Sequence, residues 1–417
     1  MKATIRKSEV AGRAKAPASK SYTIRGLMCA ALACGESRIV DPLVSDDTGA
    51  ASDVLGWVGV DICRDAAVWR VSGGDFHQPG ADLYCGDSAA TLRFMTAICS
   101  LVPGSCHLVV GPSLARRPVR PLVQALQQLG VDASCRGEVA PVTVRGGGLR
   151  GGTAELPGNI SSQFVSALLL AAPCAEQGVA LRLTTKLESR PYVMMTLECL
   201  KTFGIEVLQT GEGFRVERQS YQPATYRVEG DWSSASYFLA LGAVSGEVTV
   251  ENLNPASLQG DRVLLDFLRE MGALVELGDN SVTVRRSVLK AIDADLTDCI
   301  DLLPTVAVLA AAADGTSRFT GIDRARLKES DRVAAVREGL EAMGIKVAEG
   351  KNSLAITGSP PKGVVVDSHG DHRIAMAFSI LGTLYGGVTV AGAECVSKTF
   401  PRFWDILREI GGRVEAA

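Results

Sequence analysis

The chain has 417 residues, of which 47% are hydrophobic and 21% are charged, and its formal net charge is −3. One hydrophobic core rarely supports this length, so two domains of roughly 200 residues each are expected. Acidic and basic residues are interspersed and form no basic stretch, which argues against a nucleic-acid-binding protein. No apolar run approaches the roughly 18 residues that span a bilayer, so a membrane protein is not expected.

The cysteines and the first residues indicate the compartment. The chain has eleven cysteines, which lack the paired spacing of a metal site and lie mostly within apolar segments. Buried, reduced thiols in a cytoplasmic protein account for this pattern. The opening MKATIRKSEV leads into a polar turn and lacks the apolar core of a secretory signal. We therefore expect a cytoplasmic protein.

Along the chain, six segments repeat one pattern: a glycine or small residue, a polar cluster, and an apolar stretch rich in Ala and Leu. Each apolar stretch predicts a buried helix. Successive segments are 67 to 73 residues apart, which indicates an internal repeat. The spacing is measured between Ser21, Ser88, Ser161, Ser233, Asp301 and Asp371.

Strands and a second set of helices are predicted between these segments. Alternating Val, Ile and Thr residues predict strands near His107, Val248 and Val388. The second helices are amphipathic and each ends in a glycine that suits a left-handed cap. They begin at Pro121, Tyr192, Arg262 and Arg332. Three such repeats form a domain of about 210 residues. A generic alternating α/β chain would explain the alternation but not the fixed interval.

The polar clusters lie at the expected N-termini of the buried helices. A helix N-terminus has uncompensated N–H groups and the positive end of the helix dipole, so it favours anions. Six such ends facing one cleft would form a receptor for phosphates and carboxylates. The sequence therefore predicts an enzyme that acts on anionic substrates.

Six segments, in order over nearly the whole chain, resemble the signature segments of the 5-enolpyruvylshikimate-3-phosphate synthase family. They are ASKSYTIRGLMCAALA (18–33), LARRPVRPL (114–122), LPGNISSQFVSALLLAAP (156–173), RLKESDR (326–332), GDHRIAMAF (370–378) and SKTFPRFWD (397–405). The resemblance implies a two-domain inside-out α/β barrel of six βαβαββ repeats, three per domain, around buried helices. The first domain would span 13–227, and the second 1–12 with 228–417. The active site would lie in the interdomain cleft, which closes on its substrates.

The resemblance also implies the reaction. The enolpyruvyl group of phosphoenolpyruvate would move to the 5-hydroxyl of shikimate 3-phosphate, with release of phosphate, on the pathway to chorismate and the aromatic amino acids. This chemistry needs a base, an acid and several cations, but no cofactor or metal. The partners would be these two small molecules, and a monomer is expected because the cleft belongs to one chain.

Two segments of the first domain would bind the substrates. By resemblance, Lys20 contacts phosphoenolpyruvate and assists proton transfer, while Ser21 and Arg25 hold shikimate 3-phosphate. Arg117 would clamp phosphoenolpyruvate bidentately, whereas its neighbour Arg116 is expected at the surface. A solvated capping cluster is the alternative at Lys20.

A serine-rich segment would bind the phosphate of shikimate 3-phosphate through Ser161 and Ser162, with Ser189 as a further contact. Gln163 would turn its amide toward phosphoenolpyruvate. Ser161 could also be a helix N-cap, a role that is compatible with phosphate binding.

The second domain would supply the acid and base. Asp301, preferred over Asp298 because of its DLLP context, would take the hydroxyl proton. Glu329 would protonate the enol methylene, for which its pKa must be raised. Lys328 would bind shikimate 3-phosphate and Arg332 phosphoenolpyruvate, both facing one site if they lie four residues apart on a helix. An exposed salt-bridged helix start is the alternative.

The GDHR segment adds His372 and Arg373. Arg373 and Lys398 would complete the phosphoenolpyruvate site, and His372 would support Glu329 or bind phosphate. His369, Asp371 and His372 together could suggest a metal, but the spacing lacks further ligands and no metal is expected.

One segment departs from the family pattern. GDSAATLRF has Asp87, Ala89 and Ala90 where the family has asparagine, glycine and threonine, and it keeps Arg93. The methyl group of Ala89 would crowd the phosphoenolpyruvate pocket, so weak inhibition by the longer analogue glyphosate is expected. Asp87 would repel an anionic ligand unless a cation pairs with it, which leaves its role as a ligand contact open.

Three alternatives remain. The related enolpyruvyl transferase acting on UDP-N-acetylglucosamine has Lys-Asn where this chain has Lys20-Ser21, and a loop cysteine where Pro112 stands. A non-catalytic anion-binding protein would not need the acid Glu329. A paralogue that uses a different hydroxylated acid phosphate is excluded only weakly.

Overall fold

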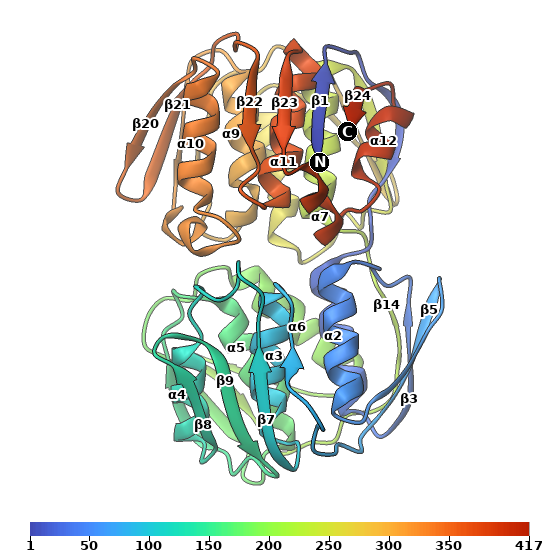
Figure 1. Ribbon diagram of the computed structural model, residues 1–417, viewed down its shortest axis with the longest axis vertical. Helices are drawn as coiled ribbons and strands as arrows, with labels where there is room; N and C mark the ends of the chain where they lie inside the picture. The colour runs from blue at the N-terminus through green and yellow to red at the C-terminus, as the bar shows by residue number, and fades with distance from the viewer. Residues whose placement is uncertain (417) are drawn as a thin grey trace. The chain divides into compact units, whose positions relative to one another are not determined.

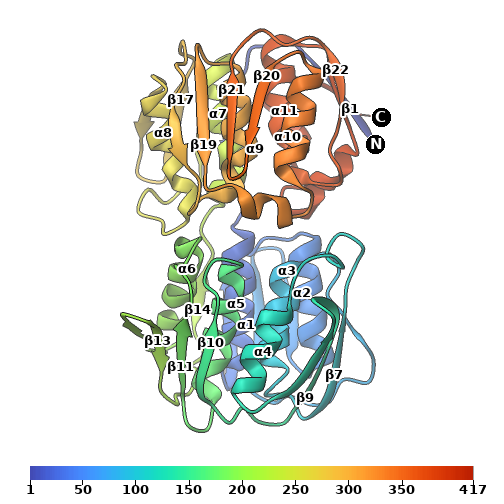
Figure 2. The ribbon, with the colours of Figure 1, turned by 90° about the vertical axis from the view of Figure 1, so that its left-hand side faces the viewer.

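The computed structural model describes residues 1–416, which form two compact units (Figures 1 and 2). The middle unit is Ala18–Val228, and the terminal unit combines Met1–Pro17 with the chain from Glu229 onward. The first crossing between units lies after Pro17, beyond the expected residue 13. The reason is that β2 (Ala11–Lys15) pairs in parallel with β15 (Glu247–Glu251), so residues 13–15 belong to a sheet of the terminal unit.

All six sheets follow one plan. Each has four strands: a parallel pair, a third strand antiparallel to it, and an outer strand antiparallel to the third. The predicted α/β repeat with three copies per unit is therefore confirmed, and its hairpin forms the outer two strands. In the last sheet the two ends of the chain, β1 (Lys2–Arg6) and β24 (Arg413–Ala416), replace the hairpin.

The middle unit contains three of these sheets. In strand order they are β14 (Thr225–Arg227), β3 (Gly35–Val40), β5 (Val68–Gly73) and β4 (Asp61–Arg64); β6 (Leu83–Tyr84), β7 (Gly104–Val109), β9 (Val139–Gly146) and β8 (Asp132–Arg136); and β10 (Gly152–Leu156), β11 (Val179–Leu183), β13 (Gly213–Val216) and β12 (Leu208–Thr210). The helices are α1 (Lys20–Leu32), α2 (Asp46–Trp57), α3 (Ala89–Ile98), α4 (Arg120–Gln128), α5 (Ser162–Ala171), the short η1 (Ala172–Cys174) and α6 (Arg190–Thr202).

The terminal unit repeats this arrangement. Its sheets are β2, β15, β17 (Ser281–Arg285) and β16 (Leu274–Leu277); β18 (Asp293–Asp295), β19 (Thr316–Thr320), β21 (Ser353–Thr357) and β20 (Lys346–Gly350); and β22 (Val364–Asp367), β23 (Val388–Ala391), β1 and β24. Its helices are α7 (Trp232–Ser245), η2 (Gly260–Val263), α8 (Leu264–Glu270), η3 (Ile300–Leu302), α9 (Leu303–Ala311), η4 (Asp323–Leu327), α10 (Arg332–Ala342), α11 (His372–Tyr385), η5 (Ala393–Lys398) and α12 (Phe403–Glu409).

The cores contain the helices that the apolar segments predicted. In the middle unit, α1, α3 and α5 are buried over most of their length, and in the terminal unit every residue of α7 and α9 is buried. A helix that is apolar on all sides is expected in such a position, because no face of it seeks water. α3 packs on α5, and α11 packs on both α7 and α9.

Two strands pair with partners that lie far along the chain. β2 precedes α1 in the chain but lies in the sheet of β15, which follows α7. β14 precedes α7 but pairs in parallel with β3, which follows α1. β2 and β15 both belong to the terminal unit, and β14 and β3 both belong to the middle unit.

The amphipathic helices end as predicted. Gly130, Gly204, Gly272 and Gly344 follow α4, α6, α8 and α10, with φ between 79° and 91°. This left-handed conformation favours glycine and turns the chain back into the next strand. Polar side chains cap the buried helices at their N-termini, as the clusters in the sequence indicated. The capping residues are Ser19, Ser88, Ser161, Asp231 and Asp371.

Candidate active site

In the terminal unit, three carboxylates surround one buried arginine at the N-termini of α10 and α11. Arg332, the first residue of α10, has a side chain that is only 1% exposed. Its NH1 donates to Asp301 Oδ1 at 2.7 Å, its NH2 to Glu329 Oε2 at 2.6 Å, and its Nε to Asp371 Oδ2 at 2.7 Å. Burial alone would lower the pKa of Arg332, but the three carboxylates raise it above its ordinary value.

Asp301, in η3, contacts two further cations. Lys328 Nζ lies 3.2 Å from its Oδ1, and Arg373 NH2 lies 3.3 Å from its Oδ2. Burial acts to raise the pKa of Asp301, but Arg373, Lys328 and Arg332 outweigh it and hold that pKa well below its ordinary value. Asp301 therefore contacts three cations, Arg332, Lys328 and Arg373.

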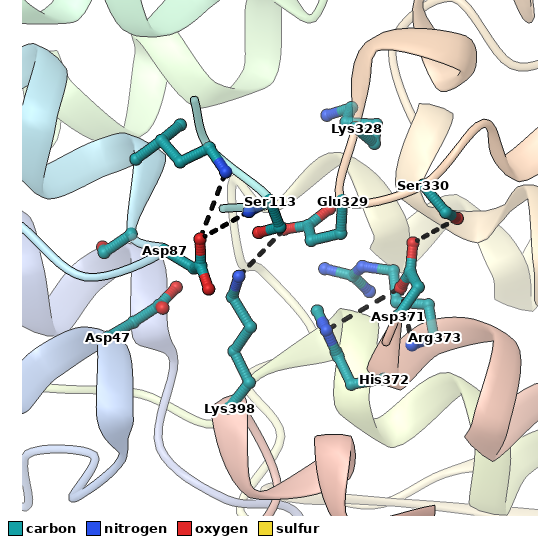
Figure 3. A network of polar contacts seen from close by, with 12 residues as sticks. Asp47, Asp87, Ser113, Lys328, Glu329, Ser330, Asp371, His372, Arg373 and Lys398 are labelled. Atoms are coloured by element: carbon teal, nitrogen blue, oxygen red, sulfur yellow. Dashed lines mark hydrogen bonds and ion pairs between the residues drawn. The ribbon is translucent and has the colours of Figure 1, made fainter. Parts of the chain in front are cut away.

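Glu329 and Lys328 lie in the loop before α10. Glu329 Oε1 is 3.9 Å from Lys398 Nζ at the end of η5, and its other oxygen accepts from Arg332 (Figure 3). The predicted helix does begin at Arg332, so the condition that Lys328 and Arg332 lie four residues apart on one helix is not met. Asp331 accepts from the Ala334 N–H and caps α10, so the helix begins at Arg332 and Lys328 is extended. Lys328 and Arg332 still converge, because both contact Asp301.

Asp371 organises the start of α11 (Figure 3). Its carboxylate is fully buried and accepts from the Arg373 N–H at 2.9 Å and from Ser330 Oγ at 3.1 Å, in addition to Arg332. His372 Nδ1 lies 3.8 Å from Asp371 Oδ1, and its side chain is 1% exposed. From the sequence, Asp371 was considered only as a metal ligand. Its position as the residue before a buried helix was the signal for this role.

The residues considered for a metal site at this segment make separate contacts. His369 Nε2 lies 3.9 Å from Glu338 Oε2, in a contact separate from that of His372 with Asp371. Among residues 1–416, no group of three or more His, Cys, Asp or Glu side chains is arranged to hold a metal ion. In the same range, no helix is long and apolar enough to cross a membrane.

In the middle unit, the start of α1 presents two basic residues. Lys20 Nζ lies 2.9 Å from Asp47 Oδ2, a buried carboxylate on α2. Arg25 is 2% exposed, and its NH1 donates to the backbone oxygen of Ser21 at 2.9 Å. Its Nε donates to Thr196 Oγ1 at 2.8 Å. Burial lowers the pKa of Arg25. These contacts fix Arg25 between α1 and α6.

Arg93, in α3, contacts two of the predicted substrate-binding segments. Its NH1 donates to Ser161 Oγ at 3.0 Å and to Gln163 Oε1 at 2.7 Å. Its NH2 donates to the backbone oxygen of Pro118 at 3.1 Å, next to the buried Arg117. From the sequence, Arg93 was noted as a retained family residue without a role, and its place inside an apolar helix was the available signal.

The remaining predicted residues lie at helix starts. Ser161 is the N-cap of α5 and Ser162 its first residue, and Ser161 Oγ also accepts from the Gln163 N–H at 3.3 Å. Ser189 precedes α6 in the left-handed region, with φ 52°, and is 2% exposed. Ala89 is the first residue of α3 and is 6% exposed. Each of these residues lies at the positive end of a helix, as an anion site requires.

A separate cavity of about 910 Å³ in the terminal unit lies away from this chemistry. Its lining includes Ser245 and Tyr385, the last residues of α7 and α11, and Ala312, which follows α9. The carboxylate–arginine cluster lies at the opposite, N-terminal ends of α9 and α11. The cavity and the cluster of charged side chains therefore lie at opposite ends of these helices.

A family model described as EPSP synthase (3-phosphoshikimate 1-carboxyvinyltransferase) matches residues 5–407. Two relatives named 3-phosphoshikimate 1-carboxyvinyltransferase come from Dehalococcoides mccartyi and Halobacterium salinarum. They are 49% and 43% identical over 418 and 426 residues, with 99% of each chain covered. A solved EPSP synthase from Acinetobacter baumannii superposes with a TM-score of 0.83 at 26% identity, covering both chains completely. The enolpyruvyl transferase NikO from Streptomyces tendae superposes with a TM-score of 0.80 at 16% identity, covering 99% and 98%, which supports the fold alone.

Proposed function

Because the chain belongs to the EPSP synthase family and is a transferase, we propose that it moves the enolpyruvyl group of phosphoenolpyruvate to the 5-hydroxyl of shikimate 3-phosphate. Phosphate is released, and the product leads through the shikimate pathway to chorismate and the aromatic amino acids. The observation that carries the proposal is the pairing of two carboxylates, Asp301 and Glu329, with the cations Arg332 and Lys398. Such a set can move protons beside bound anions.

The reaction has two steps. First, Asp301 takes the proton of the 5-hydroxyl, whose oxygen attacks the second carbon of phosphoenolpyruvate, while Glu329 gives a proton to the methylene carbon. A tetrahedral intermediate forms. Then Glu329 takes a proton back from the new methyl group, the carbon–oxygen bond to phosphate breaks, and the departing phosphate receives the proton that Asp301 took from the hydroxyl. Lys20 assists these proton transfers, and His372 supports Glu329.

Substrate binding prepares Asp301 for its role. In the free protein the net effect of burial and the surrounding cations is a pKa well below the ordinary value, which makes Asp301 a weak base. Phosphate and carboxylate groups that pair with Lys328 and Arg373 would offset these cations and raise the basicity of Asp301. Proton removal would therefore become favourable only with substrates in place.

The other residues divide between the two ligands. The shikimate 3-phosphate group is Ser21, Arg25, Ser161, Ser162, Ser189 and Lys328. The phosphoenolpyruvate group is Lys20, Ala89, Arg117, Gln163, Arg332, Arg373 and Lys398. Arg93 contacts one member of each group, Ser161 and Gln163, so the two groups are adjacent at its guanidinium.

Atoms and electrons balance in this reaction without a redox step, so we propose that it proceeds without a cofactor. We also propose that the protein works as a monomer and in the cytoplasm, where both substrates and reduced thiols belong.

Weak inhibition by glyphosate is a further part of the proposal. Ala89 is buried at the start of α3, and its methyl group takes space that glycine would leave to a ligand. An inhibition constant well above the KM for phosphoenolpyruvate is expected, and Ala89→Gly should lower it. Equal inhibition constants for the two proteins would contradict this assignment.

The test of the function is phosphate release from phosphoenolpyruvate by the purified protein. Shikimate 3-phosphate and UDP-N-acetylglucosamine are offered as acceptors, with Glu329→Gln alongside. Release with shikimate 3-phosphate alone, reduced about 100-fold or more in the variant, is expected from the loss of an acid–base group. Release with the nucleotide sugar, or an unimpaired variant, would overturn the substrate or the acid.

A further inference from the structure

Asp87 lies between Gly86 and the N-cap of α3, and its carboxylate binds the backbone of a neighbouring loop. Its Oδ1 accepts from the N–H groups of Ser113 at 3.0 Å and of Leu114 at 3.1 Å (Figure 3). These residues belong to the segment from Gly111 to Arg117, which we call the arginine loop. One oxygen atom thus receives two charge-assisted hydrogen bonds from consecutive residues.

Gly111 gives the carboxylate its space. A Cβ atom on Gly111 would lie 2.7 Å from Asp87 Oδ1 and 2.9 Å from its Cγ. The backbones also pair, since the Gly111 N–H donates to the Gly86 oxygen at 2.8 Å. The side chain of Asp87 is therefore packed directly on the arginine loop, and this fit requires a residue without a side chain at position 111.

A short route leads from Asp87 to Arg117. The oxygen of Leu114 accepts from the Arg117 N–H at 3.0 Å, and Leu114 itself is fully buried. On the other side, Arg93 holds the Pro118 oxygen. The backbone of Arg117 is thus fixed by Asp87 through Leu114 and by Arg93 through Pro118.

We propose that Asp87 is a positioning residue for phosphoenolpyruvate, which it serves by ordering the arginine loop and thereby Arg117. The inference rests on the proposed function for the identity of the ligand. The proposal also explains why a carboxylate is tolerated near an anion-binding segment, because the Asp87 carboxylate is hydrogen-bonded to two backbone N–H groups. The acceptor oxygen, and not the negative charge, is then the essential feature.

Three variants separate these features. Asp87→Ala removes the acceptor, Asp87→Asn keeps an acceptor oxygen without the charge, and Gly111→Ala pushes the carboxylate from its place. Asp65→Ala is the matched control, because Asp65 Oδ1 also accepts from a backbone N–H, that of Ala66 at 2.7 Å, in an exposed turn of the same unit. kcat, both KM values and thermal melting are measured for each protein.

We expect Asp87→Ala and Gly111→Ala to raise the KM for phosphoenolpyruvate about tenfold or more, with a smaller change for shikimate 3-phosphate. Asp87→Asn should remain within about threefold of the unaltered protein, and Asp65→Ala should match it. An unchanged KM for phosphoenolpyruvate in Asp87→Ala, or an Asp87→Asn as impaired as Asp87→Ala, would overturn the proposal.

Amide hydrogen exchange tests the loop without any activity. In Asp87→Ala the amides of Ser113 and Leu114 should exchange about tenfold faster, and in Asp87→Asn close to the original rate. Unchanged exchange in Asp87→Ala would overturn the role of Asp87 as an anchor. If the unaltered protein releases no phosphate but these amides respond, the proposed function fails and the anchoring role stands. If Asp87→Ala does not fold, Gly111→Ala and Asp87→Asn give the same comparison.

Discussion

Asp261 is a buried carboxyl group whose ionisation should destabilise the terminal unit. Its side chain is 2% exposed, and Ser233 Oγ donates to its Oδ2. The other oxygen is buried and has no hydrogen-bond partner among the described residues. Burial, then the charges of Asp301 and Asp231, raise the pKa of Asp261 from 3.8 to about 7, against the lowering effect of Arg373 and the Ser233 bond.

The sign of the effect follows from the two pKa values. Between pH 3.8 and about 7 the folded protein keeps the proton of Asp261 while the unfolded chain releases it, so stability falls as pH rises through this window. A shift of about three pKa units corresponds to about 4 kcal/mol at 1.4 kcal/mol per unit. Above pH 7 the full penalty is present.

Asp261→Asn removes this ionisation. We expect the free energy of unfolding of the variant to exceed that of the unaltered protein by about 2–4 kcal/mol at pH 8. The gain can be less than the full penalty, because the amide of Asn needs hydrogen-bond partners that the site supplies incompletely. At pH 5 the gain should be smaller by about 2.7 kcal/mol, which corresponds to the roughly two pKa units between pH 5 and about 7. Urea unfolding at several pH values, followed by the fluorescence of buried Trp232 in the same unit, measures the difference.

Asp266→Asn is the control, since Asp266 lies on α8 in the same unit and its side chain is 62% exposed. Its effect on unfolding should not depend on pH. A free-energy difference between Asp261→Asn and the unaltered protein that stays constant from pH 5 to 8 would refute the reasoning.

Two further predictions concern the effect on stability of removing the buried charge of Arg332 and of replacing glycines by alanine. Arg332→Met should cost about 3–5 kcal/mol at pH 7.5, because it leaves three carboxylates facing one another, and acid should restore part of the loss by protonating them. Urea unfolding checks this, and a cost under about 1 kcal/mol, or a greater cost in acid, would contradict it. Gly344→Ala should lower the free energy of unfolding by about 1 kcal/mol, because alanine rarely adopts the φ of 82° at this position. Crowding does not contribute, since a Cβ atom there would meet only ordinary contacts. Gly56→Ala, inside α2 with open space around it, should instead stabilise by about 0.5–1 kcal/mol, and equal effects would count against the conformational explanation.

The six-fold repeat could be predicted because its signals are local. An apolar helix after a polar cap and a glycine after an amphipathic helix depend on neighbouring residues, and Ser88, Ser161 and Gly344 adopt the expected positions. The pairing of β2 with β15 and of β14 with β3 could not be predicted, since both β2 and β14 are short strands whose partners lie far along the chain.

The sequence named candidate site residues one by one, but it assigned no role to several residues that hold other side chains in place. Asp371, Asp47 and Arg93 act by holding other side chains, and pair formation between distant segments leaves no periodic trace in a single sequence. The helix predicted from Arg332 begins at that residue, because Asp331 caps it by accepting from the Ala334 N–H. Lys328 therefore lies before the helix.

The placement of β1 and β24 in one sheet has a consequence for synthesis on the ribosome. Ala3 is paired with both Val390 and Ala416, so the last sheet of the terminal unit waits for the final residues to emerge. The middle unit is a continuous segment and can complete its sheets while the rest of the chain is still being made. During that interval β1 and β2 remain without their partner strands.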